Sequence, residues 1–80
     1  MGTNHERWGH MNRVSVMSSN IQSIGYEPST STLEIEFHGG RVYQYAGVAA
    51  LEYQRFLSAG SKGTFFHDHI KDRYACVLVV

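Results

Sequence analysis

Two tyrosines near the middle of the chain have a spacing that suits contact with nucleic-acid bases. Tyr43 and Tyr45 are separated by a single residue, Gln44. Because side chains alternate between the two faces of a β-strand, both rings would lie on the same face. Aromatic rings side by side on a sheet can stack on unpaired bases. The same spacing also suits two rings that only cover the sheet with their apolar bodies and leave their hydroxyls in water.

A second candidate site is the segment Ser61-Lys62-Gly63, which precedes a predicted helix. The start of a helix exposes backbone N–H groups, and with a lysine beside them these groups can bind an anion such as a phosphate. The alternative is that Ser61 only caps the helix by accepting a hydrogen bond from one of these N–H groups. With the cations of the hairpin and the second helix, the candidate nucleic-acid-binding residues are Arg41, Tyr43, Tyr45, Lys62, Lys71 and Arg73.

His67, Asp68 and His69 have the composition of a metal site but not its geometry. With 3.6 residues per turn, residues i and i+2 of a helix point about 200° apart, so the two histidines cannot share one ion. Neither a metal nor a cofactor is predicted. Cys76 stands between alanine and valine in an apolar tail, where packing is a more natural role than nucleophilic attack. The chain also has no glycine-rich phosphate loop and no serine nucleophile elbow, so we do not expect an enzyme.

The elements that position these residues begin with extended segments. Residues 13–16 and 21–26 flank a polar turn and form either one strand pair or one bent strand, and residues 27–31 form a hairpin loop rich in turn formers. Residues 32–38 alternate apolar and polar side chains without a fault, which is typical of a half-buried antiparallel strand. On that pattern Glu34 and Glu36 belong to a charged, solvent-exposed face.

The turn at Gly39-Gly40 decides which face the tyrosines occupy, because residues 41–46 form the returning strand. With a two-residue connection, Tyr43 and Tyr45 share the polar face with the glutamates. With a three-residue connection the parity is reversed, and both rings join the apolar residues of the preceding strand in the core. The sequence leaves both registers open.

Two helices and a short tail complete the predicted fold. Apolar side chains recur with helical spacing over residues 48–59, after which Gly60 suits a left-handed helix end. The second helix covers residues 62–73, with a buried stripe of Phe66, Ile70 and Tyr74. The tail, residues 76–80, is apolar and β-branched, so it adds an edge strand or packs on the sheet. The expected fold class is α+β: a small antiparallel β-meander followed by two helices packed on one face.

Length and composition limit the classes of protein to be considered. Eighty residues, 42% of them hydrophobic, support one core and one domain, residues 11–80. Residues 1–10 have no apolar period and are interpreted as a flexible extension in which only Trp8 would dock. Seven basic residues balance seven acidic ones, so any basic surface must be local. One cysteine, no signal peptide and no long apolar run favour a soluble cytoplasmic protein without a membrane contact.

Taken together, these segments resemble the KTSC domain, a family named after the C-terminal region of some lysyl-tRNA synthetases. The resemblance extends from Met11 to Tyr74, and no single element is specific, whereas the order and spacing of all of them are. The matching segments are Ser18 to Ile21, Ser23 to Tyr26, Leu33 to Phe37, Val42 to Tyr45, Gly47-Val48, Ser61-Lys62-Gly63, Phe66, His69-Ile70 and Arg73-Tyr74. Two departures are the alanines Ala49 and Ala75, where members often carry proline, and the more apolar end from Cys76.

The family resemblance implies a free-standing bacterial or phage protein that binds nucleic acid and catalyses no reaction. The first hypothesis is therefore a module for RNA or single-stranded DNA that uses the candidate residues above, with a salt-sensitive affinity. The second is a protein-interaction module, in which the aromatic sheet face or an edge strand near residues 77–80 accepts a protein partner or a second copy. The expected state is a monomer or a weak dimer.

Overall fold

The computed structural model describes residues 12–80, which form a five-stranded antiparallel sheet in the order β1-β2-β3-β4-β5. The meander and the C-terminal strand predicted from the sequence are thus confirmed. The predicted flexible extension and Trp8 lie outside the described residues. The strands are β1 (Arg13–Ser15), β2 (Ile21–Glu27), β3 (Thr32–Phe37), β4 (Val42–Tyr45) and β5 (Cys76–Leu78).

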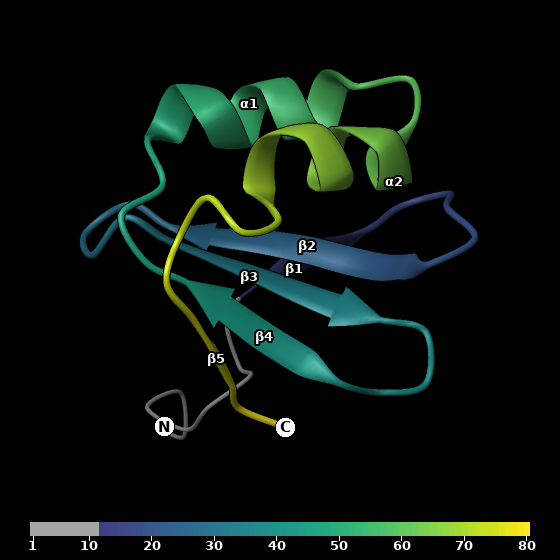
Figure 1. The fold of residues 1–80 in the computed structure, drawn as a ribbon, viewed down its shortest axis with the longest axis horizontal. Coiled ribbons are helices and arrows are strands. Elements are labelled where there is room, and N and C mark those ends of the chain that lie inside the picture. The colour runs from purple at the N-terminus through teal and green to yellow at the C-terminus, as the bar shows by residue number, and fades with distance from the viewer. Residues whose placement is uncertain (1–11) are drawn as a thin grey trace.

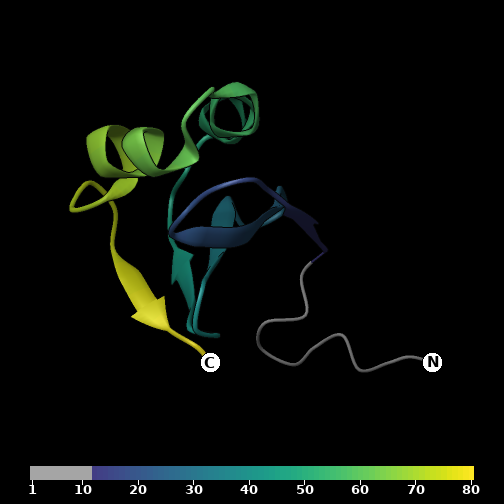
Figure 2. The same ribbon diagram turned by 90° about the vertical axis from the view of Figure 1, so that its right-hand side faces the viewer.

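Both helical segments cover the same face of the sheet, which gives a two-layer α+β fold (Figures 1 and 2). The first helix is α1 (Ala50–Ser58), and the second begins as α2 (Lys62–Phe65). The second helix then widens into a π-helical turn, η2 (Phe66–Ile70), and ends earlier than the predicted residue 73. Gly60 is not in the left-handed region, so that part of the prediction is wrong. The chain leaves α1 instead through Ala59 in an extended conformation with φ −66° and ψ 138°.

The core lies between the sheet and the helices and is built from the apolar residues of the predicted periods. Fully buried side chains from β2, β3, α1 and η2 meet there, and burial of each large apolar side chain contributes about 1.5–3 kcal/mol. Phe56 is the largest of them and is the buried residue of α1. The core residues are Ile21, Ile24, Leu33, Ile35, Tyr45, Val48, Phe56 and Ile70.

The β3–β4 hairpin has the three-residue connection, which settles the register left open by the sequence. The Phe37 N–H donates to the Arg41 carbonyl at 2.9 Å, so residues 38–40 form the loop. Gly39 and Gly40 have φ of 104° and 97°, values that residues with a side chain rarely adopt. Ile35 therefore pairs with Tyr43 and Leu33 with Tyr45. Both tyrosines lie on the helix-covered face, and the alternative that places them on the polar face is wrong.

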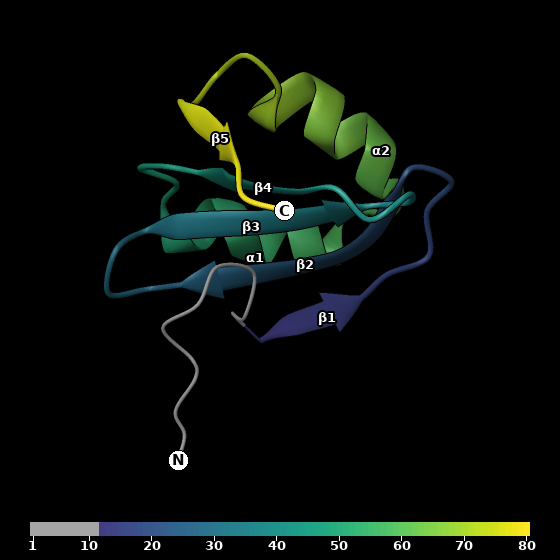
Figure 3. The same cartoon turned by 90° about the horizontal axis from the view of Figure 1, so that it is seen from below.

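Figure 3 shows the sheet from the side opposite the helices. The prediction that Glu34 is exposed on this face is wrong. Instead of facing solvent, Glu34 is fully buried, because it forms an ion pair with Arg13 of β1 and accepts a hydrogen bond from Gln44 Nε2 at 2.8 Å. Arg13 also lies 3.7 Å from Glu36, whose carboxylate accepts a hydrogen bond from Ser23 at 2.8 Å. A polar network across four strands thus covers this face.

Candidate functional site

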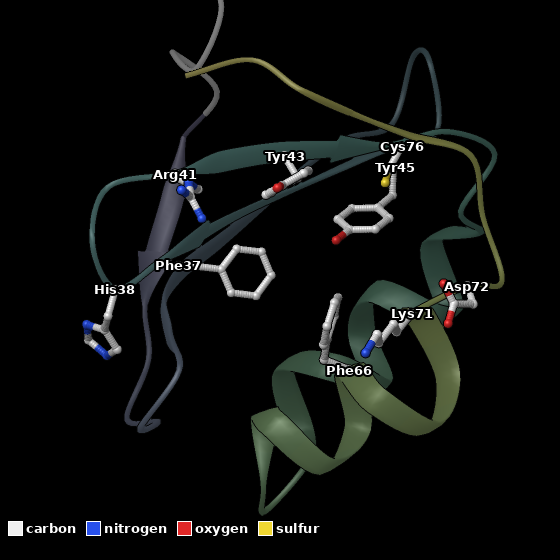
Figure 4. Close-up of a pocket in the computed structure, with 9 residues that line it drawn as sticks. All are labelled: Phe37, His38, Arg41, Tyr43, Tyr45, Phe66, Lys71, Asp72 and Cys76. Carbon is white, nitrogen blue, oxygen red and sulfur yellow. The ribbon is translucent and has the colours of Figure 1, made fainter.

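A pocket of about 390 Å³ lies where the end of the β3–β4 hairpin faces the π-helical turn η2 (Figure 4). The volume is within the range of about 300–1,000 Å³ that is usual for ligand pockets. The sheet supplies one wall, η2 and the turn after it supply the other, and β5 borders one side. The lining residues are Phe37, His38, Arg41, Tyr43, Tyr45, Phe66, Lys71, Asp72 and Cys76.

Four aromatic rings line the interior of the pocket. Phe37 makes edge-to-face contacts with Tyr43 and Phe66, with centroids 5.8 and 5.3 Å apart, and Phe66 makes another with Tyr45 at 6.0 Å. Tyr43 and Tyr45 are tilted by 39° to each other. None of these pairs is stacked, and all the rings except Tyr45 are half-buried. The pocket therefore offers aromatic surface that the protein's own rings do not cover by stacking.

The register of the hairpin and the π-helical turn together bring these rings to one place. The three-residue connection puts Phe37, Tyr43 and Tyr45 on the helix-covered face of neighbouring strands. Opposite them, Phe66 is the first residue of η2, where the Lys71 N–H donates to the Phe66 carbonyl, five residues back, at 2.8 Å. Such π-helical turns are rare and occur frequently at functional sites.

The hydroxyl of Tyr45 points toward the space between Phe37 and Phe66 (Figure 4), although the residue as a whole is only 5% exposed. Burial raises the pKa of this phenol, and the neighbouring Cys76, Tyr43 and Asp72 raise it further. The hydroxyl therefore stays protonated at neutral pH and keeps a hydrogen that it can donate to a ligand.

Three charged side chains stand around the aromatic interior. Arg41 lies at the hairpin end of the pocket, whereas Lys71 and Asp72 lie at the helical end (Figure 4). Within residues 12–80, none of the three forms an ion pair. The pocket thus combines an apolar interior with cations at both ends and one carboxylate at the helical end, a combination that suits a flat, partly charged ligand.

Four of the six sequence-predicted site residues line this pocket: Arg41, Tyr43, Tyr45 and Lys71. Lys62 and Arg73 do not. The Lys62 ammonium donates to the carbonyl of Ala59 at 2.6 Å, where it satisfies the end of α1, and Arg73 follows the last lining residue of the turn. Ser61 accepts a hydrogen bond from the Thr64 N–H at 3.2 Å, so Ser61 caps α2.

Sequence reasoning did not assign Phe37, His38, Phe66, Asp72 or Cys76 to this site. Phe37 and Phe66 carry an ordinary core pattern, and Asp72 has no motif around it. Cys76 is exposed at the residue level, which differs from the predicted packing role. In the described part of the chain, no three His, Cys, Asp or Glu side chains are grouped closely enough to hold a metal ion. No helix among residues 12–80 has the length and hydropathy needed to cross a membrane.

Comparisons with known proteins agree on one domain family. The family model of the KTSC domain matches residues 17–74. A KTSC domain protein from Yersinia pestis, whose crystal structure is known, is 46% identical, covers 88% of this chain and 99% of its own, and superimposes with a TM-score of 0.83. An uncharacterised protein of Stutzerimonas stutzeri is 38% identical over 64 residues, which are 80% of this chain and 90% of that protein.

A stretch of a much longer protein is also similar. The lysine–tRNA ligase of Nostoc sp. is 39% identical over 54 residues, which are 68% of this chain but only 10% of the ligase. The likeness therefore concerns one module of the ligase and leaves nine-tenths of that protein without a counterpart here.

Proposed function

This chain belongs to the KTSC domain family, and we propose that it is a non-catalytic module that binds single-stranded RNA or DNA through the pocket between β4 and η2. The observation that carries the proposal is the placement of Arg41 and Lys71 at the two ends of a pocket lined by four aromatic rings. Lysine–tRNA ligases act on an RNA, as their name states, and the similar stretch in one of them supports the same ligand class.

The pocket would bind a base mainly by stacking on its aromatic rings, because it has few cations to contact a run of phosphates. An unpaired base that stacks among Phe37, Tyr43 and Phe66 gains about 1–3 kcal/mol from stacking. Because the rings occupy a pocket and not an open sheet face, one or two bases enter it while the rest of the strand passes outside. A sheet face covered by helices does not allow the extended stacking platform that an exposed Tyr43 and Tyr45 would have formed.

The charges of the pocket set the expected salt dependence. Each phosphate neutralised on a single strand contributes about −0.7 to the slope of log K against log salt. If Arg41 alone contacts a phosphate the slope is about −0.7, and if Arg41 and Lys71 each contact one it is about −1.4. Raising the salt from 50 to 200 mM should then weaken binding about three- to sevenfold, a shallow dependence that matches the neutral overall charge.

Fluorescence anisotropy with labelled single-stranded RNA and DNA at these two salt concentrations tests the proposal. The Arg41→Gln/Lys71→Gln variant should bind more weakly and lose most of the salt dependence, whereas Arg55→Gln, an exposed cation of α1, should bind like the parent. Tyr43→Leu should weaken binding, whereas Tyr53→Leu, which removes a ring stacked on Tyr26 outside the pocket, should not. No binding of either strand at 50 mM salt would overturn the proposal.

The C-terminal strand favours a second candidate function, self-association. Three apolar side chains at the C-terminal end are exposed: Val77 and Leu78 in β5 are 58% and 55% exposed, and Val80 after it is 61% exposed. Strand β5 also forms one edge of the sheet, so its outer backbone groups can pair with another strand. A second copy adding its own β5 antiparallel to this edge would cover these side chains. Sedimentation over a range of concentrations should then show dimers that Leu78→Lys abolishes and that salt does not weaken.

A further inference from the structure

The turn after η2 places a carboxylate in the pocket at a backbone position that disfavours it. The Arg73 N–H donates to the Ile70 carbonyl at 3.0 Å, Lys71 has φ −60° and ψ 129°, and Asp72 has φ 62°. These values describe a type II β-turn, whose third residue needs a positive φ and is usually glycine or asparagine. A side chain there costs backbone energy, although aspartate tolerates this conformation better than most residues, and residues held in it cluster at functional sites.

The groups around Asp72 complete an arrangement of one acceptor and two donors. The Asp72 carboxylate has two acceptor oxygens and no ion-pair partner among residues 12–80. Lys71, the preceding residue, extends its ammonium toward the aromatic interior, and the protonated hydroxyl of Tyr45 points into the same space (Figure 4). Arg41 stands at the opposite end of the pocket. A ligand that spans the pocket thus meets a cation at one end and a carboxylate with neighbouring donors at the other.

We infer that the base bound by this pocket is guanine, an inference that rests on the proposed function. The Watson–Crick edge of guanine carries two adjacent N–H donors, at N1 and N2, beside one acceptor, O6. The two oxygens of Asp72 match the two donors, and Lys71 or the Tyr45 hydroxyl matches O6. The sugar and phosphate then extend toward Arg41, away from the carboxylate that would repel them.

The other three bases fit this set of groups less well. Adenine and cytosine each present one amino donor beside a ring nitrogen that accepts, and that nitrogen would face a carboxylate oxygen. Uracil presents one donor between two acceptors. A bidentate pairing of side chain and base discriminates by about 1–3 kcal/mol, so the preference for guanine should be roughly 5- to 150-fold.

Two substitutions at Asp72 test the inference without the risk of an unfolded variant. Asp72→Asn and Asp72→Gly introduce the two residues that the turn position prefers, so both proteins should fold at least as well as the parent. The probes are labelled octamers of uridine in which one central position is guanosine, adenosine, cytidine or uridine. The parent should bind the guanosine octamer most tightly, and both variants should lose that preference.

The direction of the change separates base recognition from general binding. Removing the carboxylate deletes a negative charge, so affinity of the variants for the all-uridine octamer should stay equal or rise while affinity for the guanosine octamer falls. Equal binding of all four octamers by the parent would overturn the guanine inference and leave single-strand binding intact. Binding of none of them would overturn the proposed function and the inference together.

Discussion

The buried ion pair on the outer face of the sheet gives the sharpest prediction for stability. Glu34 is fully buried and Arg13 is 20% exposed, so Arg13→Met removes the charge that compensates a buried carboxylate while keeping most of the side-chain volume. Breaking a buried pair from one side costs about 3–5 kcal/mol. Gln44 still donates to Glu34, and water can reach the partly exposed site, so we expect the lower end, about 3 kcal/mol.

A loss of this size is readily measured. For a domain of this length, about 3 kcal/mol lowers the melting temperature by roughly 12–24 °C, and it removes a large part of the 5–15 kcal/mol that holds a typical domain folded. Thermal and urea unfolding followed by circular dichroism are suitable assays. Arg55→Met is the matched control, because the Arg55 side chain is 64% exposed and lies 3.8 Å from Glu52, and a pair whose cation is exposed to water contributes about 0–1 kcal/mol.

A double variant tests the reason for the loss. In Arg13→Met/Glu34→Met no buried carboxylate remains unpaired, so the double variant should be more stable than Arg13→Met alone. If Arg13→Met destabilised the protein no more than Arg55→Met, Arg13 would not be the compensating charge, and the account of how Glu34 is buried would be wrong.

Three further measurements test other parts of the structure. In Gly25→Ala the new methyl group would lie 2.5 Å from the Asn12 carbonyl oxygen, so urea unfolding should show a loss of about 1–3 kcal/mol, whereas Gly60→Ala meets no atom within 4 Å and should cost little. Burial raises the pKa of the Tyr45 phenol, so the stability that the protonated phenol contributes is complete below its ordinary pKa of about 10 and is lost as the pH rises above that value. The melting temperature measured between about pH 9 and 11 should therefore fall less steeply with pH in Tyr45→Phe than in the parent. Ser61→Ala removes the cap of α2 and should lower the free energy of unfolding by about 0.5–2 kcal/mol, and an unchanged midpoint in urea would contradict the capping role.

Local patterns predicted the two most regular elements of this fold because their apolar side chains face the core. The alternation over residues 32–38 and the helical spacing over residues 48–59 record which side chains meet the core, and β3 and α1 occupy those segments. The cap at Ser61 was equally local. The prediction of a left-handed end at Gly60 was wrong, because the chain turns away at Ala59, whose carbonyl accepts a hydrogen bond from the side chain of Lys62.

The candidate site was less predictable because it depends on pairings between distant segments. The face of Tyr43 and Tyr45 follows from one additional residue in the β3–β4 connection, which the two glycines allow but do not require. Glu34 has the pattern of an exposed residue, and its burial is explained by partners on other strands, Arg13, which is 21 positions away, and Gln44. The second wall of the pocket needs a π-helical turn, and no periodicity marks where an α-helix widens.

The two faces of the sheet therefore use charge in opposite ways, and this difference limits where a ligand can bind. On the outer face, the charges of Arg13, Glu34 and Glu36 are paired within the protein. On the helix-covered face, the charges of Arg41, Lys71 and Asp72 come from the hairpin and from the turn after η2, where no partner from residues 12–80 neutralises them. Charges already paired inside a protein must lose that partner before they contact a ligand, whereas unpaired charges lose only water. Charged groups that are ready to bind a ligand are therefore concentrated, in the described part of the chain, around the aromatic pocket.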